Sequence, residues 1–270
     1  MKRRDWITSS LAASAFAALP AIGSAAQGAR NRGPSEREFY VLQRYQLRNG
    51  SGRGLVDDYM AKAAVPALNR AGIMPVGVFH GVAGPENPAV YVLTPDASPD
   101  DMIRVGSHLA MDKEYAAQAA SYFDAPSSAP AYVRFETSLL QAFAASVPRI
   151  EAPAEAREKQ PRILELRTYE NPSEKASATK IKMFNSGEID IFRSVGFRPV
   201  FFGQTIFGSR MPSLTYMLAF KDLDERQKKW AAFGSDPEWR KLAATPGYSD
   251  AEIVSNITNV FLSPAACSQI

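Results

Sequence analysis

The sequence predicts an α+β protein made of two tandem β-α-β-β-α-β repeats that pack together as one barrel within the chain. Three observations predict it. Matching residues recur at one constant offset of 124 positions, as from Leu42 to Leu166. Both copies show strand-like and helix-like patterns in the same order, and a stretch rich in proline and charge separates them. With 270 residues, of which 46% are hydrophobic, the chain is long enough to bury the core of such a protein.

The repeat keeps one ungapped register over most of the chain, which is hard to obtain by chance. The matched pairs are Leu42/Leu166, Tyr45/Tyr169, Gly72/Gly196, Pro75/Pro199, Val76/Val200, Asp112/Asp236, Glu114/Glu238 and Tyr115/Trp239. We therefore predict that residues 36–147 and 160–264 are two copies of one domain. Residues 148–161, "PRIEAPAEAREKQP", have no apolar face and are predicted to be a linker.

Each copy spells the same succession of elements. Strands are expected from alternating or apolar runs, and helices from apolar residues at helical spacing, ended by Gly72 and Gly196 as C-caps. In chain order, the expected ranges are strands at 38–47 and 162–171, helices at 54–72 and 173–196, strands at 74–82 and 198–207, strands at 89–94 and 213–220, a second helix after the N-caps Ser98 and Asp222, and strands at 131–140 and 252–262. This order is that of the ferredoxin-like unit, and two such sheets can pack face to face.

A tetrapeptide of the form Asp-x-Glu-aromatic occurs once in each copy, beginning at Asp112 and at Asp236. The second is followed directly by Pro237, which is favourable in the first turn of a helix because its missing N–H has no partner there. An Asp in front of a helix accepts hydrogen bonds from backbone N–H groups. We therefore interpret the tetrapeptide as the start of a helix whose aromatic residue packs onto the core, and not as an active-site motif.

Residues 1–26 are predicted to be an export signal, because a basic start is followed by an apolar segment and by the small residues Ser24 and Ala26. The run "RRDWI" from Arg3 resembles the twin-arginine pattern, with Sec export as the alternative. We therefore expect a bacterial protein that is exported to the periplasm or beyond. The apolar segment is short and interrupted, so no stable membrane insertion is expected after the signal is removed.

Composition argues against several kinds of site. The chain holds 1 Cys and 2 His, which excludes an intramolecular disulfide and a site with several histidine ligands. The formal charge of +3 does not indicate a surface for nucleic acid. No phosphate-binding loop, dinucleotide fingerprint or Gly-x-Ser-x-Gly motif is present.

The segments "ILELRTY" from Ile163 and "LDERQKKWAAFGSDPEW" from Leu223 resemble the NIPSNAP family. The first copy keeps only the outline of these motifs. The resemblance implies tandem ferredoxin-like modules of the dimeric α/β-barrel superfamily, so the expected fold is an intrachain dimeric α/β barrel. It implies no settled activity, since the wider superfamily includes cofactor-free monooxygenases, haem-degrading enzymes and ligand binders.

The candidate site residues begin with the strand "ILELRTY". Because side chains alternate along a strand, Leu164 and Leu166 share one face and Glu165, Arg167 and Tyr169 share the other. If the leucines cover the helices, the polar trio points into the barrel. Glu165 and Arg167 are expected to pair, since buried charges must be compensated. The pair could simply fix the sheet register or the interface of the two copies, or it could line a ligand pocket.

Four further residues complete the candidate set. Gln43 and Tyr45 are the equivalents of Arg167 and Tyr169 in the first copy, and His80 and Gln204 match each other on the second strand of each copy. His80 is more typical of a hydrogen-bonded strand residue than of a haem ligand or general base.

Two functions remain open. The first is a binding or interaction module that holds a small organic ligand or a partner, and the second is a small-molecule monooxygenase or haem-handling enzyme. The enzyme would need His80, or Tyr45 and Tyr169, to meet around a cavity that excludes water. The sequence requires no metal or cofactor, and it allows a homo-oligomer.

Overall fold

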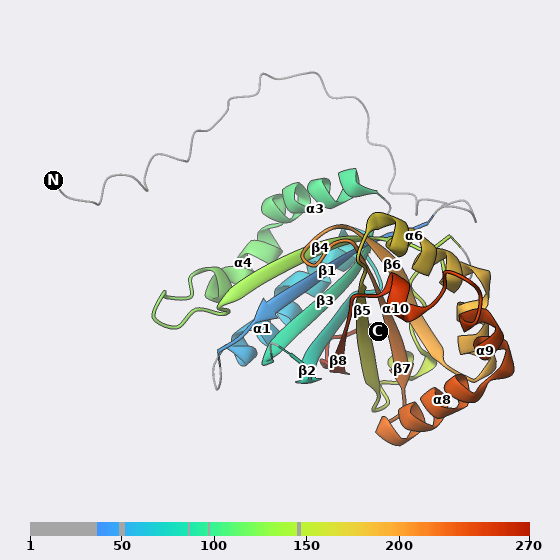
Figure 1. The fold of residues 1–270 in the computed structure, drawn as a ribbon. Coiled ribbons are helices and arrows are strands. Elements are labelled where there is room, and N and C mark those ends of the chain that lie inside the picture. The colour runs from blue at the N-terminus through green and yellow to red at the C-terminus, as the bar shows by residue number, and fades with distance from the viewer. Residues whose placement is uncertain (1–36, 49–51, 86, 97, 145–146) are drawn as a thin grey trace. The chain divides into compact units, whose positions relative to one another are not determined.

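The computed structural model describes residues 37–48, 52–85, 87–96, 98–144 and 147–270 (Figure 1). The predicted export signal, residues 1–26, lies outside these residues. The account that follows concerns the compact unit formed by the C-terminal part of the chain, which begins near Gly33.

The first repeat contains four strands and two helical segments in the predicted order. Its elements are β1 (Phe39–Gln46), α1 (Arg53–Tyr59), the π-helix η1 (Met60–Ala64), α2 (Val65–Arg70), β2 (Gly77–Ala83), β3 (Ala89–Asp96), α3 (Pro99–Met111), α4 (Lys113–Phe123) and β4 (Arg134–Ala142). The expected first helix is therefore one helical segment with a π-turn in its middle.

The second repeat follows a connection that holds the one-turn helix α5 (Ala154–Arg157). Its elements are β5 (Ile163–Glu170), α6 (Glu174–Met183), the π-helix η2 (Phe184–Glu188), α7 (Ile189–Ser194), β6 (Arg198–Phe207), β7 (Ser213–Phe220), α8 (Leu223–Ser235), α9 (Pro237–Ala243), α10 (Asp250–Ile253) and β8 (Asn256–Pro264). The offset of 124 is a structural register, since β1 and β5, η1 and η2, β3 and β7, and α3 and α8 begin and end at residues related by it.

The eight strands form one closed barrel in the order β1-β3-β2-β8-β5-β7-β6-β4. Each repeat contributes a four-stranded antiparallel sheet, and the two sheets join through the pairs β2–β8 and β4–β6. The helices of each repeat lie outside the barrel, those of the first repeat on one side and those of the second on the other (Figure 1). The predicted fold class is confirmed, and closure of the barrel gives each of the eight described strands a neighbour on both sides.

The barrel has three main cores because both faces of its strands are covered. The inner core draws residues from strands of both repeats, with Tyr40, Phe79, Leu93, Leu164, Phe201, Met217 and Leu262 among its members. One outer core packs the second sheet on its helices through residues such as Phe184, Phe192 and Phe202. The other does the same for the first repeat through residues such as Val56, Met60 and Val78.

One end of the barrel is closed by chain segments that lie outside the strands. Ile270 is fully buried in the inner core, and Ile150 of the connection packs against the same core. The carbonyl oxygen of Ile270 accepts a hydrogen bond from Nη2 of Arg162 at 2.6 Å. The barrel interior is therefore filled by apolar side chains at this end.

The repeated tetrapeptide starts a helix in both copies, as predicted. The Asp112 carboxylate accepts a hydrogen bond from the backbone N–H of Tyr115 at 2.9 Å. The Asp236 carboxylate accepts two, from Glu238 at 2.9 Å and from Trp239 at 3.0 Å. Both aromatic rings then pack onto the cores.

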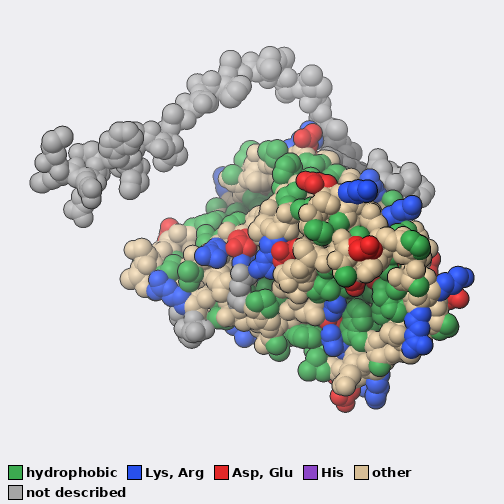
Figure 2. All heavy atoms as spheres, in the orientation of Figure 1, with side chains coloured by type: hydrophobic (Ala, Val, Ile, Leu, Met, Phe, Trp, Pro, Cys, Tyr) green, Lys and Arg blue, Asp and Glu red, His purple; other side chains and the backbone are tan. Residues whose placement is uncertain are grey.

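On the face of the molecule shown in Figure 2, side chains of both charges lie interspersed among uncharged ones.

Candidate functional site

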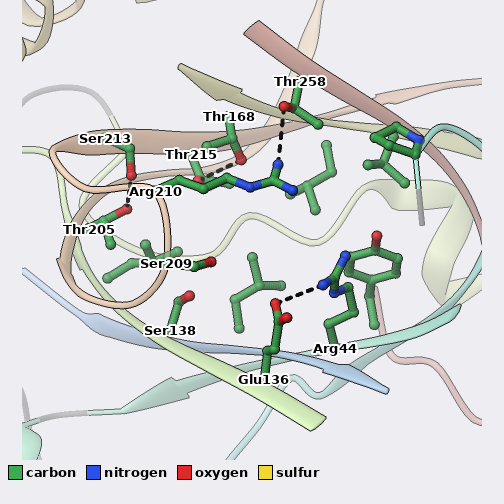
Figure 3. A pocket seen from close by; sticks show the side chains of 16 residues that line it. Arg44, Glu136, Ser138, Thr168, Thr205, Ser209, Arg210, Ser213, Thr215 and Thr258 are labelled. Carbon is green, nitrogen blue, oxygen red and sulfur yellow. Dashed lines mark hydrogen bonds and ion pairs between the residues drawn. The ribbon is translucent and has the colours of Figure 1, made fainter. Parts of the chain in front are cut away.

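The barrel interior holds a cavity at the end opposite Ile270, with a volume of about 90 Å³. Apolar side chains of the inner core line its deeper part. The hydroxyl and charged side chains that complete the lining are labelled in Figure 3. The lining side chains are Leu42, Arg44, Pro85, Tyr91, Glu136, Ser138, Leu140, Leu166, Thr168, Thr205, Ser209, Arg210, Ser213, Thr215, Thr258 and Val260. A cavity needs about 10–15 Å³ of such volume to hold one water, so this cavity has room for roughly six waters or for one small organic molecule.

A cluster of hydroxyl groups comes from inward-facing positions of the second repeat. The Oγ1 atoms of Thr168 and Thr215 lie 3.0 Å apart on neighbouring strands. Ser213 Oγ donates to Thr205 Oγ1 at 2.8 Å. These hydroxyls continue the inward face that begins with leucines deeper in the barrel, so the interior changes from apolar to polar along the strands.

Two guanidinium groups flank the cavity from different walls (Figure 3). Arg44 on β1 pairs with Glu136 on β4 at 2.8 Å. Arg210, in the hairpin between β6 and β7, donates from Nη1 to Thr258 Oγ1 at 3.2 Å on the other side. The backbone of Arg210 is left-handed, with φ of 64°, which is an unfavourable conformation for a residue other than glycine. The hairpin therefore holds this charge at the cavity mouth despite local strain.

Tyr91 brings a phenol to the same space and is only 5% exposed. Burial raises the pKa of this phenol, while the positive charges of Arg44 and Arg210 act in the opposite direction. Tyr91 is therefore a neutral hydrogen-bonding group at neutral pH. The cavity as a whole can hold a small molecule that carries oxygen atoms at one end.

The expected orientation of Glu165, Arg167 and Tyr169 is wrong. Leu164 and Leu166 belong to the inner core, so the polar trio points outward to the helices of the second repeat. The alternation along the strand was predicted correctly, but both faces of β5 are buried, and the alternation does not tell which face lies inside the barrel. That these residues bind a ligand stays a prediction.

The trio forms part of what we call the Glu165 network. The fully buried Glu165 carboxylate accepts hydrogen bonds from Arg167 at 3.1 Å, from Arg226 at 2.7 Å and 3.0 Å, and from Trp230 at 2.9 Å. Arg167 also donates to the Tyr169 hydroxyl at 3.1 Å. The expected pairing of Glu165 with Arg167 is confirmed. Because Arg226 and Trp230 belong to α8, the network ties this helix to the sheet.

The electrostatics agree with a permanently charged pair. Burial alone raises the pKa of Glu165, but hydrogen bonds from Arg226 and Trp230 and the charge of Arg167 outweigh it, so the pKa lies below its ordinary value. The guanidinium carbon of Arg167 also lies 4.6 Å from the centre of the Trp230 ring. These contacts give the trio a structural role.

A second buried charge pair lies in the same repeat. Lys180 Nζ is 3.4 Å from Glu188 and 3.1 Å from Asp250, and Lys180 and Glu188 are 1% and 2% exposed. Burial raises the pKa of Glu188 to about 7, partly offset by Lys180. This pair was not among the predicted site residues, although a Lys and a Glu eight positions apart on one helical segment, both on its apolar side, were a signal for it.

Gln43, Tyr45 and Gln204 also lie on outer faces. Tyr45 packs in the outer core of the first repeat, with its ring 4.8 Å from that of Phe135. Gln204 faces outward beside Leu214. The prediction that Gln43 and Tyr45 approach the trio inside the barrel is therefore wrong, since the barrel wall separates the two outer cores.

His80 is hydrogen-bonded through both ring nitrogens. Nε2 lies 2.7 Å from Asp57, and Nδ1 lies 2.8 Å from Arg53, both on α1. Because Arg53 can only donate, Nδ1 accepts and Nε2 donates in this arrangement. Neither nitrogen is available to a haem iron, and the barrel cavity is far too small for a haem macrocycle, so these residues do not fit that group.

Neither a metal-binding cluster nor a membrane-spanning helix is present among the described residues. The part of the chain that the structure describes contains no cluster of three or more His, Cys, Asp or Glu side chains placed to hold a metal ion. It also contains no helix with the length and apolar character needed to span a membrane.

Comparison with known proteins supports the family resemblance for the second repeat. Residues 164–269 match the model of the NIPSNAP family. The second half of the chain therefore carries a NIPSNAP domain. The comparison with curated proteins finds no match.

Two solved structures share the fold over most of this chain. A monooxygenase-like protein from Lactobacillus acidophilus is 9% identical with a TM-score of 0.56, over 87% of this chain and 97% of that one. Another from Fusobacterium nucleatum is 7% identical with a TM-score of 0.55, over 85% and 93%. A NIPSNAP family protein from Agrobacterium tumefaciens is 25% identical with a TM-score of 0.34, over 38% and 88%. The likeness to the first two shows the fold alone.

Proposed function

We propose that this protein is a binding module that holds one small, oxygen-bearing organic molecule in the polar cavity of its barrel. The observation that carries the proposal is the cavity wall itself. Hydroxyls of both sheets, the Arg44–Glu136 pair and the inward-turned Arg210 meet there, inside a barrel whose remaining interior is apolar. Pockets with an apolar body and a few converging polar groups are the usual form of small-molecule sites.

Packing alone does not account for these residues. An interior position gains more from an apolar side chain than from a hydroxyl or a charge, since buried polar groups must be compensated. The barrel interior follows that rule at Leu164 and Leu262 and departs from it around the cavity. A ligand that hydrogen-bonds to the polar wall is a physical reason for the departure.

A monooxygenase is the alternative function, in line with what the two full-length structural neighbours are called. The sequence-based hypothesis required His80, or Tyr45 and Tyr169, to meet around a cavity that excludes water. In this fold Tyr45 and Tyr169 lie in separate outer cores, and His80 is hydrogen-bonded to α1 and does not line the barrel cavity, so neither arrangement is present. Binding without catalysis is therefore the function that the geometry supports better.

We also propose that the barrel acts after export from the cell, on the strength of the N-terminal sequence pattern. Changing Arg3 and Arg4 to Lys should abolish export if the twin-arginine route is used. Fractionation of cells that produce the full chain measures this. An unchanged periplasmic yield would point to Sec export.

Binding can be tested with a mixed set of small carboxylates, amides, polyols and amines by ligand-observed NMR. We expect at least one class to bind the wild-type chain and to lose binding in Ser138→Phe, which places a ring at the cavity wall. Thr137→Phe is the matched control, because Thr137 is the next residue of β4 and is exposed on the other face. Thermal melts verify that both variants fold.

The outcome separates the cavity from other sites. Binding that persists in Ser138→Phe and disappears in Thr137→Phe would place the ligand outside the barrel. Oxygen consumption is followed with the same compounds, since turnover of any of them would favour the monooxygenase.

A further inference from the structure

The cavity changes character along its depth. Leu42, Leu140, Leu166 and Val260 form the deeper wall, and hydroxyl and charged groups form the wall near the mouth. A ligand that fits both ends must itself have a polar head and an apolar body. Its head must point to the mouth, because the polar groups lie there and the opposite end of the barrel is filled by apolar side chains such as the buried Ile270.

The charged side chains at the cavity mouth determine which sign of charge the ligand's head group can carry. Arg44, Arg210 and Glu136 are the charged side chains among the described residues that line the cavity, which gives a formal charge of +1. Arg44 and Glu136 are 12% and 35% exposed, so their charges are only partly screened by water. A single negative charge neutralises this site, whereas a dianion would leave an excess charge beside Glu136. A cationic head would face two guanidinium groups.

The shape of the donors narrows the choice to a carboxylate. A guanidinium presents parallel N–H groups that match the two oxygens of a carboxylate, and Arg44 and Arg210 come from different sides of the cavity (Figure 3). Tyr91 adds a neutral hydroxyl to the same wall. The charged groups are the main determinants of the head group, because a hydrogen bond between a guanidinium and a carboxylate is stronger than one between neutral groups such as the hydroxyl pairs Thr168–Thr215 and Ser213–Thr205.

We propose that the ligand is a small monocarboxylate, held with its carboxylate between Arg44 and Arg210 at the mouth and its short apolar body against Leu166 and Val260. The inference rests on the proposed function and names its ligand class. The small cavity limits the body to a few carbon atoms. Burial of this apolar body should strengthen binding by roughly fourfold for each methylene group until the ligand fills the apolar end of the cavity.

The test is titration calorimetry with straight-chain carboxylates from acetate to hexanoate, their primary amides and inorganic phosphate. The affinity for carboxylates should rise with chain length and then stop rising. Each amide should bind at least about tenfold more weakly than its acid. Phosphate should bind more weakly than butyrate. Equal binding of acids and amides would overturn the proposal.

Three variants locate the head group. Arg210→Gln and Arg44→Gln should each weaken carboxylate binding by roughly tenfold and leave amide binding unchanged. Glu136→Gln should strengthen the binding of phosphate relative to butyrate, because the dianion no longer faces a carboxylate. Arg240→Gln, an exposed arginine on α9, is the control and should change neither.

Failure of this inference can be told from failure of the proposed function. If amides bind as well as acids and Ser138→Phe removes both, the cavity is the site and the ligand class is wrong. If acids bind but Ser138→Phe and Arg210→Gln leave them unaffected, the cavity is not the site and both proposals fall.

Discussion

The outer cores of the two repeats differ sharply although the backbones of the repeats share one register. In the second repeat the space between sheet and helices holds Glu165, Arg167, Lys180 and Glu188. At the offset of 124, the first repeat has Val41, Gln43, Val56 and Ala64. Val56 is fully buried and Ala64 is 6% exposed, so these positions carry ordinary apolar packing. The same strands, π-turn and helices form around both sets of residues.

The buried charges of the second repeat are therefore not needed to make the fold. A buried ion pair seldom stabilises a protein more than apolar residues of the same volume, whereas losing one partner is costly. The buried charges of the second repeat occur instead where the helix α8 is firmly attached to the sheet. Trp230 on α8 donates a hydrogen bond to Glu165, and Phe233 on the same helix is buried. The equivalent helix, α3, has no buried residue.

The largest effect is expected when one charge of the Glu165 network is removed. Glu165→Val, which introduces the residue found at Val41, leaves Arg167 buried without its carboxylate and should lower the free energy of unfolding by about 3–5 kcal/mol. Arg167 is only 11% exposed and has little access to water. Chemical denaturation measures the change.

The double change Glu165→Val with Arg167→Gln is the matched comparison. It copies Val41 and Gln43 of the first repeat and should be less destabilising than Glu165→Val alone. If the double variant lowers the free energy of unfolding by the sum of the two single changes, the second repeat depends on its buried charges to fold.

The second effect concerns pH and Glu188. Burial raises the pKa of this carboxyl from its ordinary 4.5 to about 7, so the folded state holds the proton more tightly than the unfolded state. The resulting stabilisation is fully present below 4.5 and is lost as the pH rises through about 7, with a total of about 3 kcal/mol.

Glu188→Gln removes this titration and keeps the shape of the side chain. The difference in unfolding free energy between variant and wild type should therefore shift in favour of the variant between pH 4 and pH 8. Denaturation curves across that range measure it. A difference that stays constant with pH would show that Glu188 is charged throughout, stabilised by Lys180.

The third effect compares the helices α3 and α8 directly. Opening α8 exposes Phe233 and breaks the bonds of Trp230 and Arg226 to Glu165, and opening α3 exposes no buried residue. We expect the amides of α8 to exchange about 30-fold more slowly, equivalent to about 2 kcal/mol. Hydrogen exchange followed by mass spectrometry resolves the two helices, and equal protection would remove the proposed role of the network.

The smallest effect concerns the cap of α9. Asp236→Ala removes the acceptor of two backbone N–H groups and should cost about 1 kcal/mol, whereas Asp236→Asn retains an acceptor oxygen and should cost less. Thermal melts measure both. A loss of ligand binding with intact stability would mean that the tetrapeptide has a role beyond starting a helix.

The fold followed from local patterns that the sequence states twice. Alternation along "ILELRTY", the glycines that end the first helix of each copy and the carboxylates that start the later helices each fix a local conformation through short-range contacts. Two copies in one register then leave few ways to pair the strands. The cavity residues were not found, because Arg44, Glu136 and Arg210 lie far apart in sequence and carry no motif.

The sequence by itself determined the repeat, the order of elements, the helix starts and the two faces of every strand. Only the tertiary structure decided which face lies inside the barrel. Leu164 and Leu166 are buried, and so is Glu165 on the opposite face, because helices cover the outside of the sheet as fully as the second sheet covers the inside. Alternation with a period of two separates the two faces of a strand but does not say which face lies inside the barrel. Closure of the barrel, and not the alternation, therefore placed the threonines of the second repeat at the cavity and the Glu165 network under α8.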